Sequence, residues 1–194
     1  MKRALCVVVS GIVLAASSAI AQPPAAGQRT DLAASLQRGY NTVKMNLTAA
    51  AEAMPEADYM FKPGTAAELR TFGQLFAHTA QAQFGSCAAA TGAPNPAQGR
   101  NLEQELKTKA EFQKALADSF ALCDRAFDAL SGANQDEYVT QGRGEITRGA
   151  LLAGVVIHTN EMYGTTAVYM RAKGMVPPST ERMQSMRGGG RGRQ

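Results

Sequence analysis

Apolar side chains recur at intervals of three and four residues in four separate stretches of the chain, which is the spacing of one face of an α-helix. The first stretch follows Asp31, whose side chain can cap a helix that runs to about Ala53, and Pro55 ends it. Its apolar positions are Leu32, Leu36, Tyr40, Val43 and Leu47. Pro63 disfavours a helical conformation at Lys62, so the residues around it are expected to form an extended crossing.

Two capping boxes predict the next two helix starts. In this pattern a Thr and a Gln or Glu three residues later each accept a hydrogen bond from the backbone of the other. Thr71 with Gln74 predicts a helix to about Ala90, and Thr108 with Glu111 predicts one that ends near Ser131-Gly132. The positions for burial are Phe72, Leu75, Phe76, Ala80 and Phe84 in the first, and Phe112, Leu116, Phe120, Cys123 and Phe127 in the second.

The last helix is predicted from about Thr147 to Gly174, a glycine that can take the left-handed conformation at a helix end. Pro177-Pro178 is expected to stop the helix from resuming. Its stripe is Leu151, Val155, His158, Met162, Thr165 and Tyr169.

Four amphipathic helices without a strand pattern predict an all-α protein, a four-helix bundle. The connections at 54–70, 92–107 and 132–146 are long for helices that simply run up and down. We therefore expect at least one long crossover connection.

The N-terminus has the pattern of a signal peptide. Lys2 and Arg3 precede an apolar run, Leu5–Ala16, that is too short to span a bilayer, and Ala19-Ile20-Ala21 is a small-x-small cleavage pattern. Cleavage after Ala21 would make the protein periplasmic or secreted, with no membrane attachment afterwards. The expected organisation is a signal peptide at 1–21, a disordered spacer at 22–30, the helical bundle at 31–180 and a disordered Arg/Gly-rich tail at 181–194.

Charge gives little evidence of a macromolecular partner. The formal net charge is +4, and much of it comes from the signal peptide and from the arginines of the tail. The helical part is near neutral, so no basic face indicates a nucleic acid partner. A small-molecule ligand is compatible with a bundle of this kind. The protein is expected to be a monomer or a homodimer.

Two cysteines, Cys87 and Cys123, remain after signal cleavage. An even number of cysteines in an oxidising compartment favours a disulfide, which here would join two predicted helices. The alternative is that both are small, buried apolar residues.

The chain has only two histidines, His78 and His158, so a metal site or imidazole chemistry requires them to meet. Met162 follows His158 by four residues and Glu161 by three, and either is a candidate third ligand. Completion by Glu161 or water suits Zn²⁺ or Ni²⁺, whereas a Met162 thioether suits Cu(I), which we favour less. Alternatively no metal binds, and Gln81, Glu161, a tyrosine hydroxyl or water satisfies the imidazoles.

Three stretches resemble the DinB-like superfamily of four-helix bundles. They are RTFGQLFAHTAQAQ (Arg70–Gln83), SFALCDRAFDAL (Ser119–Leu130) and HTNEMYGTTAVYMRAKGMVPPS (His158–Ser179). The resemblance spans about Leu32–Ser179. It implies a metal held by three histidines, at the positions of His78, His158 and Met162. This chain departs from the pattern at Met162, which keeps the position on the helix but changes the ligand chemistry.

Three hypotheses about function follow. The first is an exported DinB-like bundle of unknown biochemical role that carries a divalent-metal site or a degenerate remnant of one. The second is a metal-dependent thiol transferase or hydrolase in which Glu161 or water replaces the third histidine. The third is a structural or small-molecule-binding bundle without metal. Whether the protein is an enzyme stays open, and no catalytic residue is assigned. Imidazole nitrogens within about 5 Å of each other would favour a metal site.

Overall fold

The computed structural model describes Gly27 and residues 29–189, and the chain is mostly helical there. The predicted signal peptide, most of the predicted spacer and residues 190–194 lie outside the described residues. The elements are α1 (Leu32–Ala53), the 3-10 turn η1 (Glu56–Asp58), α2 (Phe72–Thr91), α3 (Leu102–Glu105), α4 (Lys109–Asp128), β1 (Tyr138–Gln141), β2 (Gly144–Thr147), α5 (Arg148–Ala172) and α6 (Pro178–Gly189).

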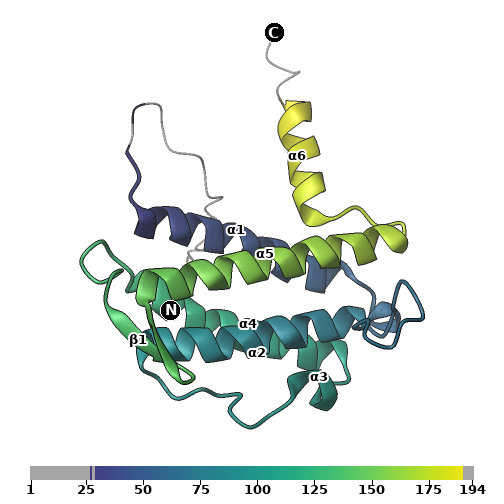
Figure 1. Ribbon diagram of the computed structural model, residues 1–194. Coiled ribbons are helices and arrows are strands. Elements are labelled where there is room, and N and C mark those ends of the chain that lie inside the picture. The colour runs from purple at the N-terminus through teal and green to yellow at the C-terminus, as the bar shows by residue number, and fades with distance from the viewer. Residues whose placement is uncertain (1–26, 28, 190–194) are drawn as a thin grey trace, which may run out of the picture.

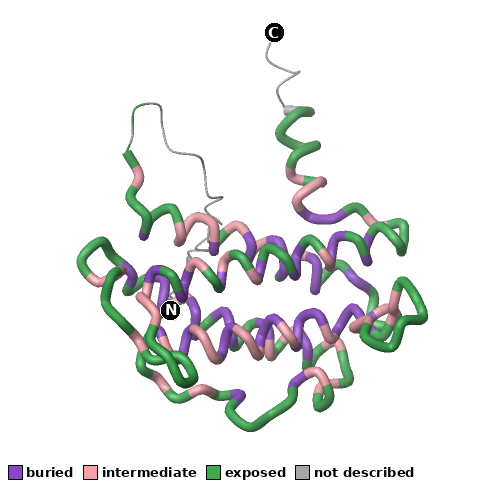
Figure 2. The backbone as a smooth tube through the Cα atoms, in the orientation of Figure 1, coloured by how far each residue is buried: buried purple, intermediate pink, exposed green. Residues whose placement is uncertain are grey.

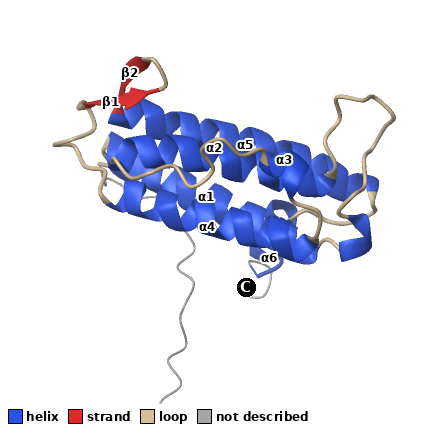
Figure 3. Cartoon of the chain, turned by 90° about the horizontal axis from the view of Figure 1, so that it is seen from below, coloured by secondary structure: helices blue, strands red, loops and turns tan. Residues whose placement is uncertain are grey.

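The long helices α1, α2, α4 and α5 lie side by side around one core (Figure 1; Figure 3). Both α1 and α2 pack against α4 and also against α5. Each long helix therefore packs against two others. The helices α2 and α5 lie next to each other, although they are not consecutive among the long helices of the chain. No helix of the described residues is long and apolar enough to cross a membrane.

The apolar stripes face inward, as the buried positions along each helix show (Figure 2). Aromatic side chains fill much of the core, and Tyr40, Phe72, Phe76, Phe112, Phe120 and Phe127 are almost fully buried. Leu32, which the periodicity places in the first stripe, is instead exposed. It is the first residue of α1 and lies at the end of the helix, beyond the packed part of the stripe.

The predicted caps form. The Asp31 side chain accepts a hydrogen bond from the backbone of Ala34, and both capping boxes, at Thr71 and Thr108, are complete. Thr147 caps α5, and Gly174 takes a positive φ of 72° just beyond its end. These helix boundaries are encoded locally, because each cap satisfies backbone groups that the helix itself leaves unpaired.

A β-hairpin lies in the connection predicted at 132–146, so the expectation of no strands is wrong there. β1 and β2 pair antiparallel, from Tyr138 opposite Thr147 to Gln141 opposite Gly144. Each strand has four residues, too few to produce a clear alternating pattern. Arg148 anchors the hairpin, because its guanidinium bonds the Glu137 carboxylate at 2.9 Å and also donates to the carbonyl of Ala90 in α2.

The chain also becomes helical again after Pro177. Pro178 is the first residue of α6, a position where its missing N–H costs no helical hydrogen bond. Tyr163 fixes this start, because its hydroxyl accepts from the Ser179 backbone N–H at 2.9 Å and donates to the Ser179 hydroxyl. The helix runs to Gly189 through much of the segment expected to be disordered, and it points away from the long helices (Figure 1).

Candidate functional site

The two histidines meet. His78 of α2 and His158 of α5 direct their Nε2 atoms at each other across 3.2 Å, with ring centroids 5.1 Å apart. They meet near the surface of the helical bundle rather than deep in its interior. The His78 side chain is 30% exposed, and His158 is also only partly buried. Its neighbours Val155, Thr159 and Met162 on α5 are buried, so His158 lies at the edge of the buried face.

Glu103 of α3 holds His78 from the other side of its ring. One carboxylate oxygen lies 2.7 Å from His78 Nδ1, and the other accepts from Arg70 Nε at 2.8 Å. Because an ionised carboxylate can only accept, His78 donates from Nδ1, and its neutral form therefore presents a lone pair on Nε2. Carboxylates play this orienting role beside metal-binding histidines.

Sequence reasoning missed Glu103, which lies in the connection 92–107 between the second and third predicted helices. Asn101 was the available signal, since its side chain caps the short helix α3 by accepting from the Gln104 backbone N–H. That signal predicts a helical turn. It does not predict that the turn packs on α2 with Glu103 facing His78.

Two glutamines on either side of His78 dock α3 onto α2. Gln74 donates to the Glu103 carbonyl at 3.1 Å. Gln81 accepts from the Leu102 backbone N–H at 2.9 Å and donates to the Arg100 carbonyl at 3.0 Å. Both side chains are therefore used to position Glu103, and the partner that satisfies His78 is Glu103 rather than Gln81.

Neither candidate for a third ligand joins the histidines. Met162 is 6% exposed and belongs to the hydrophobic core, while Glu161 lies exposed on the outer side of α5. Within the described residues, no group of three or more His, Cys, Asp and Glu side chains is arranged to hold a metal ion.

The environment sets the charge of the site. Burial lowers the pKa of His158, the neighbouring His78 and Arg70 lower it further, and Glu161 only partly opposes them. Burial alone would raise the pKa of Glu103, but hydrogen bonds and positive charge from Arg70 and His78 outweigh it and hold that pKa below its usual value. At neutral pH the site therefore combines an ionised carboxylate with a neutral His158 imidazole.

Comparison with known protein families gives a match over most of the helical region. The profile of the DinB superfamily matches residues 40–165, a range that contains both histidines and Glu103. The chain belongs to the DinB superfamily. No curated protein matches the sequence.

The histidine pair of this DinB protein fits two ligands of one metal ion. With metal–nitrogen bonds of about 2.0–2.1 Å at a tetrahedral angle, two ligating nitrogens are separated by about 3.3 Å. The observed Nε2–Nε2 distance is 3.2 Å. The donor set thus suits a two-histidine site with Glu103 behind one ligand. It does not reproduce the three-histidine set that the resemblance implies, because Met162 contributes to the core.

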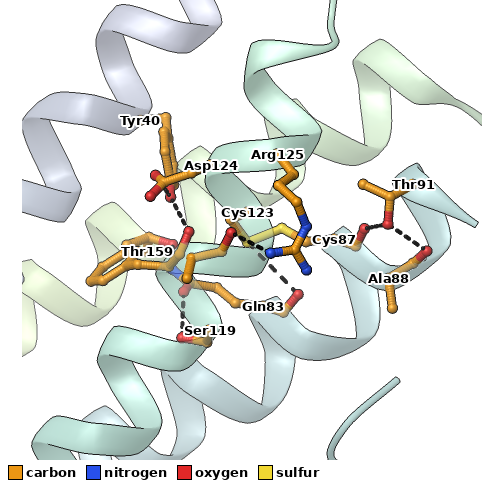
Figure 4. Close-up of a disulfide and its surroundings, with 12 residues drawn as sticks. Tyr40, Gln83, Cys87, Ala88, Thr91, Ser119, Cys123, Asp124, Arg125 and Thr159 are labelled. Carbon is orange, nitrogen blue, oxygen red and sulfur yellow. Dashed lines mark hydrogen bonds between the residues drawn. A yellow bond between two sulfur atoms is a disulfide. The ribbon is translucent and has the colours of Figure 1, made fainter. Parts of the chain in front are cut away.

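Cys87 of α2 and Cys123 of α4 form a disulfide, with Cα atoms 5.0 Å apart. Both cysteines are fully buried, so the bond joins the helices and offers no accessible thiol. A buried polar cluster lies beside it, in which Gln83 donates to Thr159 at 3.1 Å and accepts from Ser119 at 2.8 Å (Figure 4). This cluster links α2 to α4 and α5, the helix that carries His158.

Proposed function

We propose that this DinB-superfamily protein, a four-helix bundle with crossover connections, binds a divalent transition metal ion, Zn²⁺ or Ni²⁺, through His78 and His158. The observation that supports this most strongly is the 3.2 Å separation of two Nε2 atoms, one of them on an imidazole whose Nδ1 is held by a carboxylate. Neutral imidazole nitrogens suit both ions.

The residues around the pair have separate roles in this proposal. Glu103 selects the tautomer of His78 and increases the basicity of its Nε2. Arg70 holds the second oxygen of Glu103, and its own carbonyl accepts from the Tyr169 hydroxyl at 2.9 Å. When bound, the metal would lower the pKa of a coordinated water or thiol, which is the chemistry that a hydrolase or thiol transferase needs.

The position of Met162 favours Zn²⁺ or Ni²⁺ over Cu(I). A thioether ligand would have to leave the core, where Met162 packs with the other buried side chains of α5. Burial of a methionine side chain is worth about 1.5–3 kcal/mol, which such a movement would sacrifice.

A second candidate function is a bundle without metal. The same 3.2 Å separation is within hydrogen-bonding range, so one imidazole N–H can donate to the other ring and join α2 to α5. In that case the pair would contribute to stability and would have no affinity for metal.

Calorimetric titration of Zn²⁺ and Ni²⁺ into the full chain distinguishes the two candidates. The metal proposal predicts one ion per chain, loss of binding in His158→Ala and unchanged binding in Met162→Leu, the matched control on the same helix. Absence of saturable binding would support the bundle without metal. Equal binding by wild type and His158→Ala would place the metal away from the histidine pair and refute the proposed site.

We also propose that the protein is exported after cleavage behind Ala21. The composition of residues 1–21 supports this proposal, and so does the Cys87–Cys123 disulfide, because such bonds persist in oxidising compartments. Expression of the full gene product followed by cell fractionation and N-terminal sequencing tests it. The expected mature N-terminus is Gln22, and a product that retains Met1 in the cytoplasm would refute it.

A further inference from the structure

A cavity separate from the histidine pair lies between α2, α4 and the connection that carries α3. Its volume is about 490 Å³, and neither histidine lines it. That volume falls within the range of about 300–1,000 Å³ that is typical of small-molecule sites. Viewed from below, the connection with α3 runs along the outside of the long helices (Figure 3).

The walls of the cavity are largely apolar. They include Phe84 from α2, Leu102 and Leu106 from the α3 region, and Ala115 and Leu122 from α4. Phe84, Leu102 and Leu122 are also buried members of the core, so their positions are fixed by packing. The wall can therefore receive an apolar group without rearrangement of the bundle.

Within the described part of the chain, two charged groups at the cavity have no ionic partner, the Glu111 carboxylate, which backbone N–H groups hold, and one cation. Glu111 accepts from the backbone N–H groups of Lys107 and Thr108, and Asp118 pairs with Lys114 at 2.7 Å. Arg100 pairs with Glu105 at 2.6 Å.

Arg125 differs from these groups. Its guanidinium donates to the Ala121 carbonyl at 3.2 Å and forms no ion pair with any of the residues that the structure describes. Figure 4 shows it on α4, close to the disulfide. Because a guanidinium has five N–H donors, most of its hydrogen-bonding capacity is available to a ligand.

We propose that this cavity binds a small carboxylate with an apolar tail, of the class of short- and medium-chain fatty acids. The tail lies against Phe84, Leu106 and Ala115, and the carboxylate bonds Arg125. Beside Arg125 an aliphatic amine is disfavoured, since its cation would face the guanidinium, and a neutral alcohol would gain less from the guanidinium than a carboxylate does.

Calorimetric titration of the full chain with octanoate, octan-1-ol and octylamine tests the head group. The proposal predicts saturable binding of octanoate at one site, weaker binding of octan-1-ol and the weakest binding of octylamine. Equal affinity for all three probes would overturn the role of Arg125. Absence of saturable octanoate binding would overturn the site itself.

Three variants locate the site. Arg125→Gln should weaken octanoate binding by about fivefold, the upper effect of a solvent-exposed ion pair, and leave octan-1-ol binding unchanged. Ala115→Trp should abolish binding of both by filling the cavity. Arg143→Gln, on the exposed β1–β2 turn, is the matched control and should bind octanoate like wild type.

The variants also provide the contradicting results. Octanoate binding that is unchanged in Arg125→Gln, or reduced equally in Arg143→Gln, would overturn the proposal. Arg125 is exposed, so Arg125→Gln is expected to fold even if Ala115→Trp does not. A native circular dichroism spectrum and unchanged binding in Ala115→Trp would place octanoate elsewhere on the molecule.

Discussion

His78 and His158 are separated by 80 positions in the sequence, yet their Nε2 atoms lie 3.2 Å apart. The contact joins α2 to α5, two helices that also share the buried hydrogen bond between Gln83 and Thr159. The histidines are therefore placed by two helices that pack together, while Glu103, which orients one of them, is placed by the short helix α3.

Glu103→Gln tests the orienting role. The amide keeps the shape of the side chain but loses the charge that holds His78 and Arg70, so the affinity for Zn²⁺ should fall by about 10–100-fold. Calorimetry measures this change. Glu105→Gln, also on α3 but paired with Arg100, is the control and should retain wild-type affinity. Equal affinities for wild type and Glu103→Gln would show that the carboxylate does not support a metal ligand.

The pKa of His158 predicts how the stability of metal-free protein depends on pH. Burial and the neighbouring His78 lower this pKa below the ordinary value of 6.5. Below about pH 6.5 the unfolded chain therefore binds more protons at this residue than the folded chain. The free energy of unfolding should fall as the pH decreases from about 6.5 to the folded-state pKa. The contribution of neutral His158 to the free energy of unfolding is fully present above about pH 6.5.

Urea denaturation in the presence of a chelator, at several values between about pH 7.5 and 5, measures this effect. His158→Gln removes the titrating group and should show a shallower dependence on pH over the same interval. A slope that is identical in the variant would mean that other groups account for it.

The disulfide predicts a large loss of stability when it is removed. It joins residues 36 positions apart, and the loop-entropy relation gives about 3–4 kcal/mol for a loop of that length. The double variant Cys87→Ala/Cys123→Ala should lose about this much free energy of unfolding, measured by denaturant titration. A loss below about 1 kcal/mol would be incompatible with the relation. Because both cysteines are fully buried, a mild reductant should not reduce the folded protein.

Gly73 lies where α2 and α4 pack too closely for a larger side chain. A Cβ added there would overlap the ring of Phe112, which is fully buried. Gly73→Ala should therefore lower the free energy of unfolding by about 1–3 kcal/mol. Gly164→Ala, at a helical site with open space around it, should instead raise it by about 0.5–1 kcal/mol. Similar effects for both variants would contradict the tight packing at Gly73.

Much of the fold follows from local sequence. Asp31, Thr71, Thr108 and Thr147 each mark a helix start, because a capping side chain satisfies backbone groups a few residues away. The periodicity of apolar residues then identifies the faces that pack together. These signals extend over one or two helical turns, which is why they can be recognised without the structure.

The elements that sequence reasoning missed depend on contacts between distant residues. The β-hairpin is held by Arg148 against the end of α2, and the start of α6 by Tyr163. Glu103 is the clearest case at the site. Its bond to His78 requires α3 to be docked by Gln74 and Gln81, and no local pattern specifies that docking. The meeting of the histidines was predictable from the resemblance, but their partner was not.

Anomalous X-ray diffraction from crystals of the full chain grown with Zn²⁺ tests the central claim most directly. The proposed site predicts one zinc peak about 2.0–2.1 Å from Nε2 of both His78 and His158, with Glu103 still on Nδ1 of His78. Crystals that contain zinc only at other residues, with the two imidazoles still in direct contact, would contradict it.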